Sequence, residues 1–197
     1  MTRVIAGAAG GRLLAVPPGN GTRPTSDRAR EGLFSTWQAL QGTLDEARVL
    51  DLYAGSGAIG LEALSRGASH ALLVEADARA VRTVRENVKS IGLPGAEVRA
   101  GKAAQIVQGG TPATPYDLVF LDPPYVVTDD DLREILLTLR AEGWLTGDAL
   151  VTVERSTRGG EFGWPDGFDA LRSRRYGEAT FWYGRAASTC DDSVIAP

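Results

Sequence analysis

The sequence predicts a doubly wound, Rossmann-like α/β fold with a mostly parallel sheet of seven strands. Three observations carry this prediction. Apolar runs of strand length alternate with helical patterns from residue 48 onward, a glycine-rich loop follows the first of these runs, and the last such segment is typical of an antiparallel hairpin. Strands that alternate with helices pair in parallel, whereas a terminal hairpin adds an antiparallel edge to the sheet.

A small extension is expected before the alternating region. Two short apolar runs, 2–7 and 11–16, are joined by two alanines and two glycines, which is typical of a β-hairpin. A loop rich in proline and glycine follows, and the pattern from Thr25 to about Leu40 is helical, with an N-cap at one of residues 25–27. The expected division of the chain is an N-terminal extension over 1–24, a principal domain over 25–185 and a disordered tail over 186–197.

The principal domain is expected to contain seven strands and four further helices. Each apolar run is bounded by turn residues, and the longest helical pattern places Val81, Val84 and Val88 on one face and arginines on the other. The expected strands are 47–53, 70–76, 96–100, 116–122, 149–155 and two within 168–185, and the expected helices are 58–66, 78–91, 103–108 and 130–141.

Composition favours a soluble, monomeric, cytoplasmic protein. The chain has 197 residues, a net charge of −4 and one cysteine, Cys190, so it has no intramolecular disulfide. It contains no cluster of cysteine and histidine, and therefore no metal site is expected. No run of 18 apolar residues predicts a membrane span, and the N-terminus, interrupted by glycines and Arg12, is a poor signal peptide.

A glycine-rich loop follows the first strand of the principal domain. Gly55, Gly57 and Gly60 form the pattern G-x-G-x-x-G, which allows a tight turn and a close approach of a ligand to the backbone. Glu75 comes 20 residues after Gly55, at the end of the next strand, where a carboxylate can accept hydrogen bonds from both hydroxyls of a ribose. The loop predicts a cofactor that contains adenosine, either NAD or S-adenosylmethionine (SAM).

Asp51 favours SAM over NAD. It precedes Gly55 by four residues and therefore lies at the mouth of the loop. A carboxylate at this place repels a pyrophosphate, but it attracts the ammonium and sulfonium groups of SAM.

A second motif, Asp122-Pro123-Pro124-Tyr125, follows a buried strand. Its prolines cannot continue the strand, and they fix an extended backbone at its carboxyl end, where open α/β sheets bind ligands. An exocyclic amine of a base is a poor nucleophile because its lone pair is delocalised into the ring. Asp122 and the carbonyl of Pro123 can accept its two N–H bonds and free the lone pair, and Tyr125 offers a ring on which a flipped base can stack.

The two motifs together predict methyl transfer from SAM to an exocyclic amine. Taken alone, the second motif is equally typical of a strand-terminating turn with a solvent-facing tyrosine. Methylation of cytosine at C5 is disfavoured, because that chemistry needs a cysteine nucleophile and Cys190 lies in the C-terminal tail.

Positive charge is concentrated at the N-terminus. Residues 1–35 carry a net charge of +3, whereas the other 162 residues carry −7. A basic arm on an acidic body suits a protein that touches phosphate with one face, and a solvated segment without a partner is the alternative. Arg172, Arg174 and Arg175 offer a second place for phosphate contacts, or else a solvated strand edge.

Several sequence motifs of the chain occur together in a known family. DLYAGSGAIGLEALSRGA, VEAD and DPPY are preceded by GGRLLAVPP and GTRPTSDRAREGLF. They resemble the RsmD family, bacterial methyltransferases that act on guanine N2 of 16S rRNA. The resemblance covers about residues 2–185, and RPTSDRAREGLF is its most family-specific part, since other amine methyltransferases share the glycine loop and DPPY.

The resemblance implies a class I SAM-dependent methyltransferase fold. The product that the cofactor leaves behind would be S-adenosylhomocysteine. Its implied substrate is one guanine of 16S rRNA, within an assembled or partly assembled 30S subunit. The sequence departs from a common pattern after the third strand, where an acid often meets the adenine amine of SAM but Ala100-Gly101-Lys102-Ala103 stands here. We expect Asp51, Tyr53, Ala54, Gly55, Ser56, Gly57, Gly60, Glu75, Ala76, Lys102 and Ala103 to bind the cofactor, Asp122, Pro123, Pro124 and Tyr125 to be catalytic, and Arg3, Arg12, Arg23, Thr25 and Arg28 to contact RNA.

Other functions fit parts of the pattern. DPPY also serves adenine-N6 methyltransferases of DNA, although the chain has little room for a separate target-recognition domain. The amide of a protein glutamine presents a similar planar nitrogen. A ribosome-assembly factor without catalytic activity would not need the intact glycine loop, and in an NAD-dependent oxidoreductase DPPY would have no task.

Overall fold

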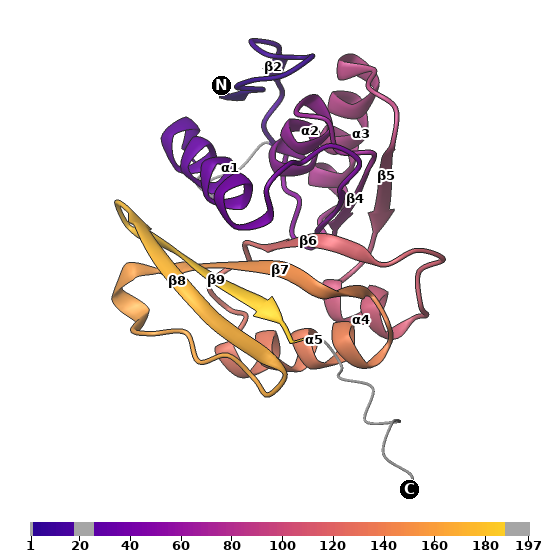
Figure 1. Cartoon of the computed structure of the whole chain (residues 1–197). Coiled ribbons are helices and arrows are strands. Elements are labelled where there is room, and N and C mark those ends of the chain that lie inside the picture. The colour runs from indigo at the N-terminus through magenta and orange to yellow at the C-terminus, as the bar shows by residue number, and fades with distance from the viewer. Residues whose placement is uncertain (1, 18–25, 188–197) are drawn as a thin grey trace, which may run out of the picture.

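A seven-stranded sheet forms the centre of the computed structural model, which describes residues 2–17 and 26–187 (Figure 1). Its strands are β3 (Arg48–Asp51), β4 (His70–Glu75), β5 (Ala96–Ala100), β6 (Tyr116–Leu121), β7 (Leu145–Ser156), β8 (Phe168–Tyr176) and β9 (Ala179–Ala186). Their order across the sheet is β5-β4-β3-β6-β7-β9-β8. Strands β3 to β7 are parallel to one another, and β9 pairs antiparallel with both β7 and β8. The predicted fold class is confirmed.

Helices cover both faces of this sheet, as Figure 1 shows, with α1, α2 and α3 on one side and α4 and α5 on the other. The helices are α1 (Asp27–Gln41), α2 (Ala58–Ser65), α3 (Ala78–Ile91), α4 (Ala103–Gln108) and α5 (Asp129–Ala141), with a 3₁₀ turn at Thr157–Gly159. Each layer buries its own apolar core against the sheet, around Trp37 on the first side and around Trp144 on the second. Among the described residues, no helix is both long enough and apolar enough to span a bilayer.

Helix α1 is fixed at both ends and along one face. The Ser26 hydroxyl accepts the N–H of Ala29 at 3.2 Å, an N-cap that contributes about 1 kcal/mol. Its buried residue Trp37 donates from Nε1 to Thr152 Oγ1 of β7 at 2.8 Å, and the helix ends at Gly42, whose φ is +90°. Since α1 leads into the amino end of β3, its own N-terminus lies toward the carboxyl edge of the parallel strands.

Most expected bounds of the principal domain lie within two residues of the observed ones, and the exception is β7. It begins at Leu145, four residues before the expected start, because Leu145 pairs with Tyr116 across an irregularity in the ladder. The C-terminal hairpin forms as expected, and its turn at Gly177 and Glu178 reaches the carboxyl end of β7, where the N–H of Thr157 donates to the Glu178 carbonyl at 2.8 Å.

The N-terminal hairpin is much shorter than the expected runs 2–7 and 11–16. Only β1 (Thr2–Arg3) and β2 (Leu13–Leu14) pair. Val4 still bonds across the hairpin, to Arg12 and Gly11. The next two N–H groups, of Ile5 and Ala6, donate to the Glu62 carboxylate of α2 at 2.6 and 3.0 Å. The extension is therefore attached to the principal domain through a buried carboxylate.

Candidate active site

A pocket of about 860 Å³ opens at the carboxyl ends of β3, β4 and β6. The chain winds in opposite directions on the two sides of β3, and such a switch point is where open α/β sheets bind ligands. The volume is that of a site for a small molecule or cofactor. Of the residues expected to bind the cofactor, Asp51, Tyr53, Ala54, Gly55, Ser56, Glu75, Ala76, Lys102 and Ala103 line this pocket.

The other two expected cofactor residues, Gly57 and Gly60, shape the loop from behind. Gly57 is the N-cap of α2 and has φ +79°, a left-handed conformation that favours glycine. A Cβ on Gly60 would lie 2.3 Å from Leu73 Cδ2, so a larger residue would displace the Leu73 side chain where α2 packs on β4. Their roles follow from backbone geometry and helix packing.

Glu75 is held in position by the glycine loop. Its Oε2 accepts the N–H of Gly55 at 2.9 Å, and its Oε1 accepts the N–H of Asp77 at 2.8 Å. A carboxylate oxygen has two lone pairs, so each oxygen keeps one acceptor position for a ligand hydroxyl.

Acidic groups gather in the pocket floor. Asp51 is 1% exposed, and neither of its carboxyl oxygens has a hydrogen-bond partner of normal geometry. Burial, together with the charges of Asp122 and Glu75, raises the pKa of Asp51 to about 8, and burial raises the pKa of Asp122 to about 7. Because the three groups repel one another as anions, a ligand with positive charge would stabilise their ionised forms. The ammonium and sulfonium groups of SAM fit this requirement.

The DPPY segment leaves β6 at the rim of the pocket. Asp122 and Pro124 line the pocket, Pro123 is buried behind them, and Tyr125 is 86% exposed and points outside the lining. Stacking of a base on Tyr125 therefore stays a prediction. After this segment, α5 begins with a capping box in which Thr128 and Asp131 bond reciprocally.

Arg155 of the neighbouring strand holds the residues that follow the DPPY segment. From the end of β7, its Nη1 donates to the Val127 carbonyl at 3.0 Å, and its Nη2 pairs with Asp129 Oδ1 at 2.7 Å. This contact was not predicted. Its only signal in the sequence is the position of Arg155 at the carboxyl end of the strand after the motif.

The N-terminal arginines are partly engaged within the protein. Arg12 donates to the carbonyls of Ile91, at 2.6 Å, and Ser90, and so caps the C-terminus of α3. Arg3 is 60% exposed and pairs with Asp27, its Nε lying 3.4 Å from Oδ2. Arg28 is exposed in the first turn of α1. None of the three lines the pocket, and Arg23 and Thr25 lie outside the described residues.

Asn87 of α3 connects the extension to the glycine loop. Its Nδ2 donates to the carbonyls of Ala15 and Ser56, at 2.9 and 2.8 Å, and its Oδ1 accepts the N–H of Ala15 at 2.8 Å. This role was missed, although a polar residue between Val84, Val88 and Ile91 on the apolar face of a helix was a usable signal. Among the residues that the structure describes, no three His, Cys, Asp or Glu side chains are grouped to hold a metal ion.

Comparison with known proteins adds to this geometry. The family model described as Conserved hypothetical protein 95 matches residues 2–185. The chain belongs to this family. The ribosomal RNA small subunit methyltransferase D of Escherichia coli strain K12 is 40% identical over 159 residues, which is 80% of this chain and 76% of that protein. The protein of the same name from Haemophilus influenzae is 36% identical over 155 residues, 77% of either chain.

A solved structure is similar over nearly the whole chain. It is a protein of Escherichia coli, yhhF, described as a candidate methyltransferase. It has a TM-score of 0.81 at 35% identity and covers 95% of this chain and 98% of its own. The resemblance that the motifs indicated is thus confirmed.

Proposed function

We propose that this protein transfers a methyl group from SAM to the exocyclic N2 amine of a guanine in 16S rRNA, within an assembled or partly assembled 30S subunit. The observation that carries the proposal is that Asp122 of DPPY shares one pocket with the glycine loop and Glu75. The names of the small-subunit relatives support the choice of rRNA.

The cofactor's parts match separate parts of the pocket. Glu75, oriented by Gly55 and Asp77, accepts hydrogen bonds from the ribose hydroxyls. Asp51 attracts the positive charges of the methionine end, and Lys102 and Ala103 border the place of the adenine. When bound, SAM supplies a methyl group activated by the sulfonium and leaves as S-adenosylhomocysteine.

Asp122 and its neighbours act on the amine. The Asp122 carboxylate accepts one N–H of the guanine amine and the Pro123 carbonyl accepts the other, which frees the nitrogen lone pair. The positive charge of the cofactor favours the ionised form of Asp122 and offsets the effect of burial on its pKa. The exposed ring of Tyr125 stacks on the flipped base, a contact worth about 1–3 kcal/mol. No strong base is needed, because the amine can release its proton after transfer.

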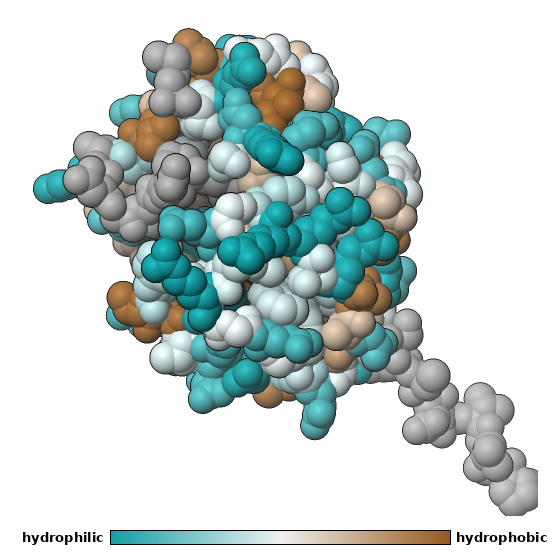
Figure 2. Space-filling view, turned by 90° about the vertical axis from the view of Figure 1, so that its left-hand side faces the viewer, coloured by the Kyte–Doolittle hydropathy of each residue, from teal (hydrophilic) through white to brown (hydrophobic). Residues whose placement is uncertain are grey.

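The RNA face is formed by the N-terminus of α1 and by the β8–β9 hairpin. A Cβ on Gly32 of α1 would lie 2.0 Å from the Tyr176 hydroxyl, so these elements touch near the hairpin turn. Figure 2 views the side toward which this turn points, and hydrophilic side chains gather across the middle of that face. The exposed arginines of these elements and of the turn after β7 are Arg28, Arg158, Arg172, Arg174 and Arg175.

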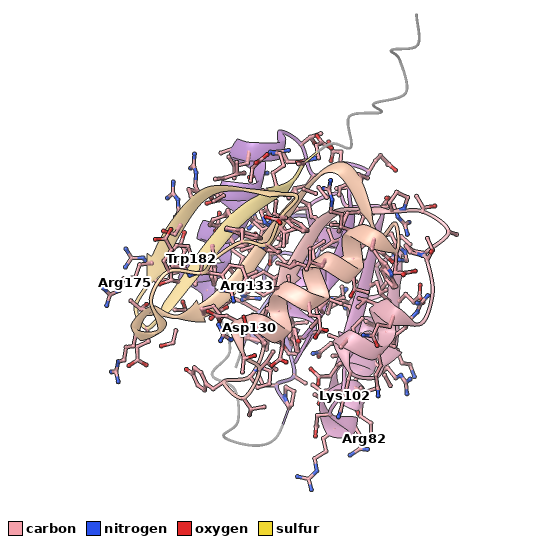
Figure 3. The ribbon with its side chains drawn as sticks, turned by 90° about the horizontal axis from the view of Figure 1, so that it is seen from below. Arg82, Lys102, Asp130, Arg133, Arg175 and Trp182 are labelled. Atoms are coloured by element: carbon pink, nitrogen blue, oxygen red, sulfur yellow. The ribbon has the colours of Figure 1, made fainter. Side chains whose placement is uncertain are left out.

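Arg175 marks the outer limit of this surface. Figure 3 shows it at the edge of the hairpin, directed away from the fold, whereas Arg82 and Lys102 lie on the opposite side of that view. Arg172 and Arg174 pair with Tyr183 and Phe181 and therefore share their face of the sheet, the one that α1 covers. Phosphate contacts from Arg28 of α1 and from the hairpin arginines would place the RNA across the pocket mouth.

The decisive test is methyl transfer from labelled SAM to 30S subunits of cells that lack the endogenous enzyme, with nucleoside analysis of the product. We expect label in N2-methylguanosine of 16S rRNA. Free 16S rRNA, duplex DNA and ribosomal protein serve as competing substrates in parallel reactions. Label in N6-methyladenine or in a glutamine amide would contradict the proposal and favour one of the two alternative methyltransferases.

A further inference from the structure

Arg30 of α1 is a buried cation with unused donors. The residue is 0% exposed and lines the pocket. Its Nη2 donates to the Arg3 carbonyl at 2.7 Å and to Asp27 Oδ1 at 2.6 Å. Among the residues that the structure describes, its Nε and Nη1 have no hydrogen-bond partner.

This arrangement is costly unless a ligand completes it. A buried N–H without an acceptor is destabilising, and the cost is larger when the N–H belongs to a charged group. Asp51 can reduce the cost of its own burial by taking up a proton, but an arginine does not lose its proton in a protein. The two free donors of Arg30 therefore call for an acceptor that enters with the ligand.

The position of Arg30 indicates which part of the ligand it meets. Among the basic residues of the lining, Arg79 and Lys102 are exposed, whereas Arg30 is buried. It bonds to the carbonyl of Arg3, and the neighbouring Thr2 also lines the pocket, so Arg30 lies where the N-terminal extension borders the pocket. The acidic floor attracts the positive groups of a ligand, so one zwitterionic ligand can satisfy both Asp51 and Arg30.

We propose that Arg30 binds the carboxylate of the methionine moiety of SAM. The inference rests on the proposed function for the identity of the cofactor. It gives β1 a task at the cofactor site, because the Arg3 carbonyl and Asp27 of α1 hold the guanidinium through its Nη2. It also explains why an arginine, and not an apolar residue, is buried at this point of α1.

Decarboxylated SAM is the probe that isolates this contact. Titration calorimetry would compare SAM and decarboxylated SAM on the wild type, on Arg30→Met and on Arg30→Lys. A charge-assisted hydrogen bond of about 1.5–3 kcal/mol corresponds to a preference for SAM of about 10- to 150-fold that depends on Arg30. We expect Arg30→Met to lose this preference while its affinity for decarboxylated SAM stays unchanged, and Arg30→Lys to keep part of it.

Asp27→Asn is the matched control, since it weakens the support of Nη2 but leaves Nε and Nη1 in place, and it should retain most of the preference. Equal losses for both ligands in Arg30→Met would overturn the inference and assign Arg30 a structural role. If Arg30→Met does not fold, an Arg30→Lys variant that keeps the full preference for SAM over decarboxylated SAM would also overturn the inference. A variant that binds RNA more weakly but keeps this preference would overturn it as well. Absence of SAM binding to the wild type would instead contradict the proposed function.

Discussion

Two ionisable side chains, Asp51 and Arg30, are buried at the same pocket with polar atoms that have no hydrogen-bond partner among the described residues, and the half-buried Asp122 adds a second negative charge near Asp51. Local rules of stability disfavour each of them, since buried charges are normally paired. Residues that reduce the stability of the fold in this way are expected at functional sites. Their charges are complementary to those of an amino-acid zwitterion with an additional positive group, and this match supports SAM more strongly than the glycine loop alone.

Asp122→Asn should reduce methyl transfer by at least about 100-fold and leave SAM affinity within about threefold of the wild type. An amide can still accept one hydrogen bond, but it lacks the negative charge that helps to free the lone pair of the amine; a positioned catalytic group of this kind contributes about 10²–10⁴-fold. The measurement is single-turnover transfer to 30S subunits, with calorimetry for SAM. Asp166→Asn, at an exposed position away from the pocket, is the control. Near-normal turnover of Asp122→Asn would remove this role.

Motif residues could be predicted from the sequence, whereas their supporting residues could not. Asp51, Glu75 and Asp122 follow strands at fixed offsets, so their meeting at one edge follows from strand–helix alternation. Arg30 and Asn87 depend on how the N-terminal extension packs on the principal domain, which no local pattern specifies. The charge pattern predicts that Arg12 contacts RNA, and this stays a prediction; the bond of its guanidinium to the end of α3 is a structural role that the pattern did not indicate.

At the scale of elements, the extension and the C-terminal hairpin lie on either side of α1. The extension bonds to α2 through Glu62 and to α3 through Asn87, and the hairpin turn contacts α1 at Gly32. The length of the N-terminal strands could not be predicted from the sequence. Their apolar residues suit a strand, but the backbone N–H groups of Ile5 and Ala6 donate to the Glu62 carboxylate of α2. The division at residue 24 stays a prediction, since it falls outside the described residues.

Replacement of Arg172, Arg174 and Arg175 by glutamine should weaken 30S or rRNA binding and flatten its dependence on salt. Each phosphate contact that is lost lowers the slope of log K against log[salt] by about 0.7–0.9. We therefore expect a slope reduced by up to about 2–3, with SAM affinity unchanged, as measured by filter binding from 50 to 200 mM salt.

The matched control removes the same charge from another surface, with Arg82, Arg85 and Lys89 of α3 replaced by glutamine; all three are exposed. Equal slopes for both triple variants would show that the hairpin has no special contact with RNA. The RNA face would then lie elsewhere, and the hairpin arginines would be a solvated strand edge.

At the scale of the whole molecule, one sheet combines cofactor binding and catalysis. The strand order brings the ends of β3, β4 and β6 side by side, although Asp51 and Asp122 are far apart in the sequence. The same order brings the carboxyl groups of Asp51 and Asp122 close enough to repel each other at the pocket. The stability of the entire fold is therefore linked to pH and to the ligand.

The stability of the ligand-free protein should fall as pH rises from about 5 to 8.5. Asp51 and Asp122 have pKa values of about 8 and 7 in the fold, above the ordinary value of 3.8. Between these limits the native state binds more protons than the unfolded state, so their contribution is present at low pH and is lost as pH rises through the folded pKa. His70, whose pKa burial lowers below its ordinary value of 6.5, acts in the opposite direction, because its unfolded form binds more protons in the range just below 6.5.

Comparison with Asp51→Asn separates the two effects, because His70 is unchanged in the variant. The melting temperature of the wild type should decline relative to that of Asp51→Asn across this range, by about 2–4 °C for each kcal/mol lost. Saturating SAM should reduce the decline in the wild type, since its positive charge favours the ionised acids, and should stabilise Asp51→Asn much less. Parallel melting curves for the two proteins at every pH would mean that Asp51 is already ionised in the ligand-free pocket, and that the attraction between this acid and the cofactor is not what sets the stability of the fold.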